Sequence, residues 1–175
     1  MKTFVAGSAC GTLALILGVL AFLKMGWAPI RADAPLSPWT SHFLDSAVHA
    51  AVRHRAPAQQ NPLPADDNLL IAGGKLYLND CVGCHGEPGQ PPSEFGATFY
   101  PPAPQLPRTA PQYTEAEIFW IAKHGIRRTG MYAQGHSYSD QDLWRLAAFI
   151  RQMTRLTPRV LEAIQQRPSQ PAISK

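Results

Sequence analysis

Residues 81–85 read CVGCH, so two thiols stand three residues apart and an imidazole directly follows the second. Thiols at this spacing can bind a zinc ion, form a redox-active disulfide or bond covalently to a prosthetic group. The chain has 175 residues and three cysteines, and the remaining one, Cys10, lies in a distant apolar segment. The chemistry of Cys81, Cys84 and His85 therefore depends on what the rest of the chain supplies.

A zinc site and a redox disulfide both lack the surroundings that they need. A structural zinc site has four ligands, but after His85 the sequence holds no cysteine and only two histidines, His124 and His136. A thioredoxin-like pair would lie beside a βαβ pattern, and residues 66–155 show no alternating strands. C-x-x-C-H is also the attachment signature of c-type haem, in which both thiols bond to the haem and the histidine ligates its iron. The motif favours this third chemistry.

Two helices are predicted to cross next to this motif. The segment GGKLYLNDCVGCH carries Gly73 and Tyr77 on one helical face, eight and four residues before Cys81. The segment SYSDQDLWRLAAFIRQM carries an apolar stripe of Leu143, Leu146, Ala147, Phe149 and Ile150. We expect the second helix to approach the first closely at Gly73, with Tyr77 packed on Leu146 and Phe149.

Helix start and stop signals delimit the later helices. Thr114 and Glu117 form a capping box at the start of TEAEIFWIAKHGI, and Gly125 ends that helix. Ser139 is the expected N-cap of the last helix, with Asp142 at its third helical position. The sequence therefore predicts three short helices around a gap of the size of a haem.

These elements together resemble a class I c-type cytochrome over residues 67–154, about half of the chain. The resemblance is carried by the Gly-x-x-x-Tyr-x-x-x-Cys approach and by CVGCH, KHGI..TGM and SDQDLWRLAAFI. It implies an all-α cytochrome c fold, with three core helices around one covalently attached haem c, and one-electron transfer. It also implies Met131 as the distal ligand. Cys81, Cys84, His85 and Met131 would then bind the cofactor, with His85 and Met131 on its iron.

A thioether on the distal face suits electron transfer, because this neutral, soft ligand favours ferrous iron and raises the reduction potential. The alternatives to Met131 are His136, His124 and an open iron site. Relatives commonly follow this methionine with proline, a small residue and an aromatic residue, whereas residues 132–134 read Tyr-Ala-Gln here. Without the proline, the loop is expected to be more mobile.

The segment PPSEFGATFYPPAPQL, residues 91–106, is rich in proline and has little expected regular structure. We expect it to wrap one edge of the haem and exclude water. Pro102 or Pro104 is expected to supply a carbonyl that accepts a hydrogen bond from the second ring nitrogen of His85, because such bonds orient ligand histidines.

Residues 4–23 are uncharged, and at about 1.5 Å per residue they span about 30 Å, the thickness of a bilayer's hydrocarbon core. They predict a transmembrane anchor. A cleaved signal peptide is the alternative, but its apolar region would be shorter, at roughly 7–15 residues. Because haem c is attached outside the cytoplasm, the resemblance implies a single-pass protein of the inner (cytoplasmic) membrane with its haem domain on the periplasmic side.

The net charge of +4 lies mainly outside the expected haem domain, since residues 66–155 hold nine of the 12 acids and only eight of the 16 bases. This near-neutral domain argues against nucleic-acid binding. Residues 41–56 predict a basic amphipathic helix that lies on a membrane or docks on a partner. The expected organisation is an anchor over 1–31, this helix and a proline-rich linker over 32–65, the haem domain over 66–156 and a tail over 157–175 with a short helix from 158 to 166.

The predicted function is one-electron transfer by a membrane-anchored periplasmic cytochrome c with a single haem. It would act as a tethered carrier or as a cytochrome subunit of a respiratory or photosynthetic complex, with redox proteins or complex subunits as partners. No acid–base pair, nucleophile or substrate signature stands beside the motif, so an enzyme is not predicted. Two alternatives stay open. One is an enzyme or sensor with a labile Met131, and the other is a scaffold in a larger assembly.

Overall fold

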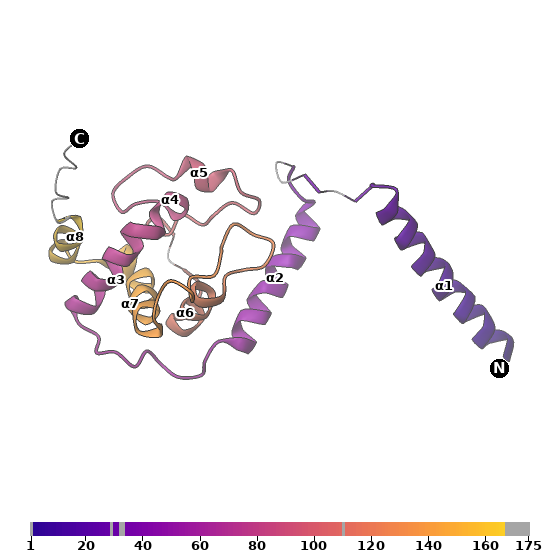
Figure 1. The fold of residues 1–175 in the computed structure, drawn as a ribbon, viewed down its shortest axis with the longest axis horizontal. Helices are drawn as coiled ribbons and strands as arrows, with labels where there is room; N and C mark the ends of the chain where they lie inside the picture. The colour runs from indigo at the N-terminus through magenta and orange to yellow at the C-terminus, as the bar shows by residue number, and fades with distance from the viewer. Residues whose placement is uncertain (1, 29, 32–33, 110, 167–175) are drawn as a thin grey trace. The chain divides into compact units, whose positions relative to one another are not determined.

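A computed structural model describes residues 2–28, 30–31, 34–109 and 111–166, and within them every regular element is a helix (Figure 1). The chain forms two compact units, Met1–Ala32 and Asp33–Lys175. The first contains α1 (Lys2–Lys24). The second contains α2 (Pro38–Arg55), α3 (Asp67–Asp80), α4 (Val82–His85), α5 (Glu94–Ala97), α6 (Glu115–His124), α7 (Asp140–Gln152), a 3₁₀ turn at Met153–Arg155 and α8 (Pro158–Gln165). The predicted all-α class is confirmed.

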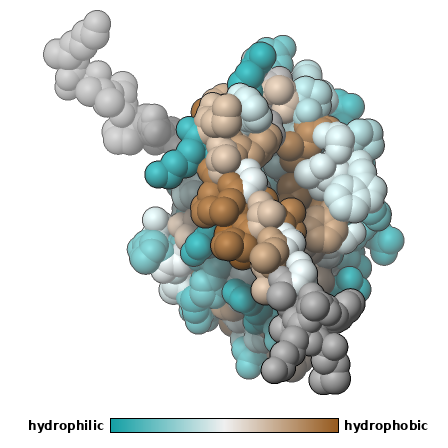
Figure 2. All heavy atoms as spheres, turned by 90° about the vertical axis from the view of Figure 1, so that its right-hand side faces the viewer, coloured by the Kyte–Doolittle hydropathy of each residue, from teal (hydrophilic) through white to brown (hydrophobic). Residues whose placement is uncertain are grey.

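The 23 residues of α1 correspond to a helix of about 35 Å. Its apolar side chains are exposed, and those of Leu15, Leu17 and Leu23 are more than half exposed. Figure 2 shows hydrophobic atoms along the helix nearest the viewer. By length and composition, Gly7–Lys24 could cross a membrane, and a signal sequence near an N-terminus would pass the same test.

The core of the second unit is the crossing of α3 and α7, which form the most extensive contact between elements. The two backbones approach so closely at Gly73 that an added Cβ would lie 2.1 Å from the carbonyl oxygen of Arg145. Tyr77 and Phe149 are fully buried beside this point, with their ring centroids 5.5 Å apart. The predicted close approach and the packing of Tyr77 on Phe149 are confirmed.

Replacing Gly73 with alanine should therefore destabilise the fold strongly. The new methyl group would overlap the backbone of Arg145 and would lie 2.9 Å from the Cβ of Phe149, so neither helix can yield by rotating a side chain. We expect a loss of about 3 kcal/mol in the free energy of unfolding, measured by guanidinium titration of the purified protein. Gly83→Ala is the matched control, because its Cβ would meet nothing within 4 Å. Equal effects of the two substitutions would contradict this packing.

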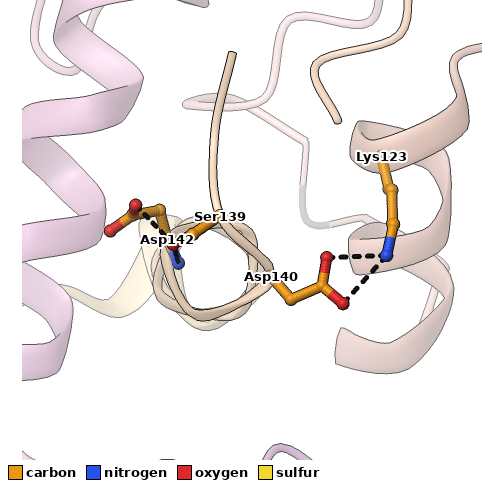
Figure 3. Close-up of polar contacts among 4 residues, drawn as sticks. All are labelled: Lys123, Ser139, Asp140 and Asp142. Carbon is orange, nitrogen blue, oxygen red and sulfur yellow. Dashed lines mark hydrogen bonds and ion pairs between the residues drawn. The ribbon is translucent and has the colours of Figure 1, made fainter. Parts of the chain in front are cut away.

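The expected helix starts are present. Thr114 and Glu117 form the capping box of α6, and Gly125 ends that helix with a φ of 66°. Ser139 caps α7 by accepting a hydrogen bond from the Asp142 amide, and its hydroxyl also donates to the Asp142 carboxylate (Figure 3). This hydroxyl, followed by the Arg145 guanidinium, holds the pKa of Asp142 below its usual value.

Helices α6 and α7 pack through an aromatic pair, because Phe119 and Trp144 stack with ring centroids 4.3 Å apart. At the exposed edge of this contact, Lys123 Nζ lies 2.6 Å from Asp140 Oδ1, which joins the end of α6 to the first turn of α7 (Figure 3). Three helices, α3, α6 and α7, thus form one continuous core.

The amphipathic segment expected to dock on a membrane or a partner instead packs, over its second half, on its own unit. Helix α2 contacts α6, its Val52 is 1% exposed, and His49 stacks on Tyr113 with ring centroids 4.6 Å apart. Asn61 in the following linker donates to Glu115 Oε2 and to the Trp144 carbonyl. The first half of α2 differs, since its stacked pair Trp39 and Phe43 is exposed.

The short helix expected after residue 157 is present as α8, which packs against α3. Its Val160 and Ile164 are buried, and an added Cβ at Gly74 would lie 2.6 Å from Ile164. Residues 158–165 therefore contribute to the core, although the sequence suggested only a tail. Residues 167–175 of the expected tail lie outside the described residues.

Candidate functional site

The CVGCH segment follows α3 directly. Cys81 ends α3 and is also the residue before α4, which carries the remaining four residues of the motif. Each carbonyl from Gly83 to Gly86 accepts a hydrogen bond from outside this short helix. The donors are the Ser93 hydroxyl to Gly83, the Gln105 amide to Cys84, the Leu106 backbone N–H to His85 and the Tyr77 hydroxyl to Gly86. Because helix C-termini leave such carbonyls without partners inside the helix, these four contacts hold the motif in one conformation.

The imidazole of His85 is oriented by a backbone carbonyl. Its Nδ1 lies 2.9 Å from the carbonyl oxygen of Pro104, and a carbonyl can only accept, so Nδ1 carries the proton. Burial lowers the pKa of His85, against an opposing effect of this hydrogen bond. The ring is therefore neutral near pH 7, and Nε2 keeps the lone pair that a metal ligand needs. Of the two carbonyls expected to orient His85, the structure selects Pro104.

The electrostatics of Cys81 disfavour a redox-active pair. Burial, followed by the charge of Asp80 and the neighbouring Cys84, raises the pKa of the Cys81 thiol to about 12. Reactive cysteines have a lowered pKa instead. Within the described residues, no group of three or more His, Cys, Asp or Glu side chains could hold a metal ion.

The proline-rich segment packs directly against the motif, as expected. Gly96 of α5 lies so close that an added Cβ would be 1.9 Å from the Cys84 carbonyl oxygen. The Gly96 carbonyl accepts a hydrogen bond from the Ala103 backbone N–H, and the Gly96 N–H donates to the Ser93 hydroxyl. The segment thus folds back on itself and brings the Pro104 carbonyl to His85.

Met131 is presented by a loop that is fastened at both ends. The Ile126 N–H donates to the Met131 carbonyl at 2.9 Å, and the Met131 N–H donates to the Thr129 hydroxyl at 3.1 Å. Gly125 permits this closure, because its φ is positive and an added Cβ would lie 2.6 Å from the Met131 carbonyl oxygen. Beyond Met131, the Gln134 N–H donates to the Ala122 carbonyl of α6. These hydrogen bonds restrain the loop, although the sequence has no proline directly after Met131.

One cavity brings the candidate residues together. Its space of about 670 Å³ includes a part open to solvent, and its wall contains Cys81, Cys84, His85 and Met131. The rest of the wall is mostly apolar and includes Phe99, Ile126 and the prolines at 101, 102 and 104. Two thiols, an imidazole lone pair and a thioether around an apolar space are the donor set that a covalently attached haem requires.

The alternative distal ligands lie elsewhere. His136 and His124 are both exposed, and neither lines this cavity. The ring of His124 instead lies 5.0 Å from that of Trp120. The four residues carried over from the resemblance therefore share one cavity wall, and the competing histidines do not.

Two glutamines of the site were not foreseen from the sequence. Gln105 makes three side-chain hydrogen bonds beneath the motif. Gln134 is a buried polar residue, at 5% exposed, and it lines the cavity. Gln134 had a signal in the sequence, because it stands where relatives carry an aromatic residue after the methionine. Gln105 had none, since its partners lie up to 21 residues away.

Comparisons with known proteins agree with this geometry. Residues 68–150 match a family described as cytochrome c oxidase, cbb3-type, subunit III. The chain is also similar to a thiosulfate dehydrogenase of Stutzerimonas stutzeri (strain A1501), at 23% identity over 159 residues. This similarity covers 84% of the chain and 49% of the relative. The chain thus spans about half the length of this curated relative.

Proposed function

We propose that residues 68–150, which match the family of cytochrome c oxidase, cbb3-type, subunit III, form a class I c-type cytochrome domain. The chain would then transfer single electrons through one haem c held at the periplasmic face of the inner membrane. The family implies a covalently bound haem c with iron. A single CVGCH motif accounts for one haem. The partners are redox proteins, met either by a tethered carrier or by a subunit of a membrane complex.

Each candidate residue has a distinct role in this proposal. Cys81 and Cys84 would hold the haem through thioether bonds, while His85 Nε2 and the Met131 sulfur would ligate its iron. The bound haem supplies reversible one-electron oxidation and reduction. Pro104 orients the His85 ring through Nδ1, and the apolar wall limits the access of water. A neutral imidazole and a thioether together favour a raised reduction potential.

The observation that carries the proposal is the shared cavity wall of Cys81, Cys84, His85 and Met131. If His85 and Met131 both ligate the iron of the bound haem, no position on that iron would be left for a substrate. Such a site would serve electron exchange and would not bind a reactant on the metal. This distinguishes a carrier from an enzyme or a ligand sensor.

The similarity to a thiosulfate dehydrogenase favours a second candidate, oxidation of thiosulfate at this site. The cavity speaks against it, because its described wall contains no lysine or arginine to attract a dianion, and its one acidic residue is Asp80. Mixing the oxidised full chain with thiosulfate would separate the two candidates. Rapid, saturable reduction of the haem would support the enzyme, and slow reduction without saturation would support the carrier.

The anchoring part of the proposal predicts the effect of removing residues 1–31. Because α1 alone is long and apolar enough among the described helices to span a bilayer, a chain that starts at residue 32 behind a cleavable signal should appear as a soluble haem protein. Its absorbance spectrum should equal that of the full chain, and cell fractionation followed by haem staining would measure both properties.

Two results would contradict membrane anchoring. Edman sequencing of the mature full chain could find a start after residue 31, which would identify a cleaved signal peptide. Alternatively, the shortened chain could remain with the membranes after a carbonate wash, which would place the membrane contact in residues 32–175.

A further inference from the structure

The segment that orients His85 is itself held by one side chain, that of Gln105. Its amide nitrogen donates to the carbonyl oxygens of Cys84 and Ala103, each at 3.1 Å. Its amide oxygen accepts from the Ser93 backbone N–H at 2.7 Å. Both N–H groups and the oxygen of the carboxamide are thus used, and all three partners are backbone groups.

These bonds tie together the three stretches of chain that meet around the motif. Cys84 belongs to the motif, Ser93 precedes α5, and Ala103 lies in the proline-rich segment. Gln105 directly follows Pro104, whose carbonyl accepts from His85 Nδ1 at 2.9 Å. The next residue, Leu106, donates its N–H to the His85 carbonyl at 3.2 Å.

The space around Gln105 is adapted to this side chain. Gly86 has a φ of 85°, and an added Cβ there would lie 2.8 Å from Gln105 Oε1. A glycine directly after His85 therefore leaves room for the carboxamide. Prolines at 101, 102 and 104 have no N–H to donate, so few backbone bonds are available to hold the Pro104 carbonyl in place. The carboxamide supplies the missing connection.

We propose that Gln105 is a positioning residue for the haem ligand His85, which sets the hydrogen bond between His85 Nδ1 and the Pro104 carbonyl and thereby tunes the reduction potential. This inference rests on the proposed function. Donation from Nδ1 gives the imidazole more anionic character and makes it a stronger ligand, which stabilises ferric iron. Weakening that hydrogen bond should therefore raise the reduction potential.

The test replaces Gln105 with methionine in the full chain, which keeps the length of the side chain and removes its hydrogen bonds. Gln90→Met is the matched control, because Gln90 is exposed in the same loop and, among the described residues, its side chain has no hydrogen bond. We expect the equilibrium constant for reduction to rise at least threefold in Gln105→Met, which is about 28 mV at 59 mV per tenfold change. The control should stay at the wild-type value.

A second measurement follows His85 itself. In ferrous protein with ¹⁵N-labelled histidine, exchange of the His85 Nδ1 proton with solvent should be at least tenfold faster in Gln105→Met than in the wild type or Gln90→Met. If Gln105→Met fails to incorporate haem, Gln105→Asn carries both measurements, because it keeps an amide that is one methylene too short to reach the Cys84 carbonyl.

An unchanged potential, or a changed potential with unchanged Nδ1 exchange, would overturn the role of Gln105. If the proposed function itself is wrong, the wild-type protein rather than the Gln105 variant would give the unexpected result. The wild type itself would then lack a covalently bound low-spin haem, or its spectrum would not respond to loss of His85.

Discussion

Replacing His85 with alanine should abolish normal haem incorporation and leave a largely unfolded domain. The fold surrounds a mostly apolar cavity that is partly open to solvent, so without its cofactor this part of the core has nothing to pack against. We expect the yield of covalently bound haem to fall at least tenfold, measured by haem staining and by the pyridine haemochrome spectrum. His136→Ala should behave like the wild type, because His136 is exposed outside the cavity.

The two cysteines of the motif should each account for one thioether bond. Cys81→Ala and Cys84→Ala should leave at most a single bond, which shifts the haemochrome band, whereas Cys10→Ala should change nothing because Cys10 lies on α1. A well-folded, haem-free domain of residues 66–155, with a cooperative unfolding transition, would refute the assignment of the site.

Replacing Met131 with histidine should leave a low-spin haem but lower its reduction potential substantially. Imidazole stabilises ferric iron more than a thioether does, so the equilibrium constant for reduction should fall by more than tenfold, or about 59 mV for one electron. Ile126 and Thr129 form hydrogen bonds to the backbone of Met131 and close the loop. The backbone at position 131 should therefore keep its position in the variant, and the imidazole should project from the same point as the thioether. A redox titration followed by absorbance measures the change.

Met131→Ala provides the complementary result. It should open the iron to carbon monoxide, which the wild type should exclude, and it should remove the absorbance near 695 nm that this family is expected to show. His136→Ala is the control. A conversion to high spin in His136→Ala, together with an unchanged spectrum in Met131→Ala, would mean that His136 is the distal ligand.

The restraint of the loop that carries Met131 also helps to decide whether the protein is an electron carrier or a ligand sensor. The sequence lacks the proline that commonly follows the methionine in relatives, which favours a mobile loop. In the structure, backbone bonds to Ala122 and Lys123 at the end of α6 fasten residues 134 and 135 instead. Helix ends offer such carbonyls because they have no partner within the helix. A fastened loop supports stable ligation and hence electron transfer.

The sequence by itself determined the features whose causes lie within about one helical turn. The spacing of Cys81, Cys84 and His85 limits the chemistry of the motif, because residues at positions i, i+3 and i+4 lie on one face of a helical turn. The caps at Thr114 and Ser139 were predictable because each bonds to an amide three residues later. The close approach at Gly73 was also foreseen, since a glycine on the packed face of a helix leaves space for the backbone of a second helix.

Only the tertiary structure decided which distant groups meet. The choice of the Pro104 carbonyl for His85, the bonds of Gln105 to Cys84 and Ser93, and the packing of α2 and α8 on the second unit all depend on the path of the chain between them. In the sequence, Val52 looks like part of a docking face, Val160 like part of a tail, and Gln105 like part of a proline-rich segment with little regular structure. They are buried or bonded because hydrogen bonding and apolar burial depend on neighbours in space, and no local pattern records those neighbours.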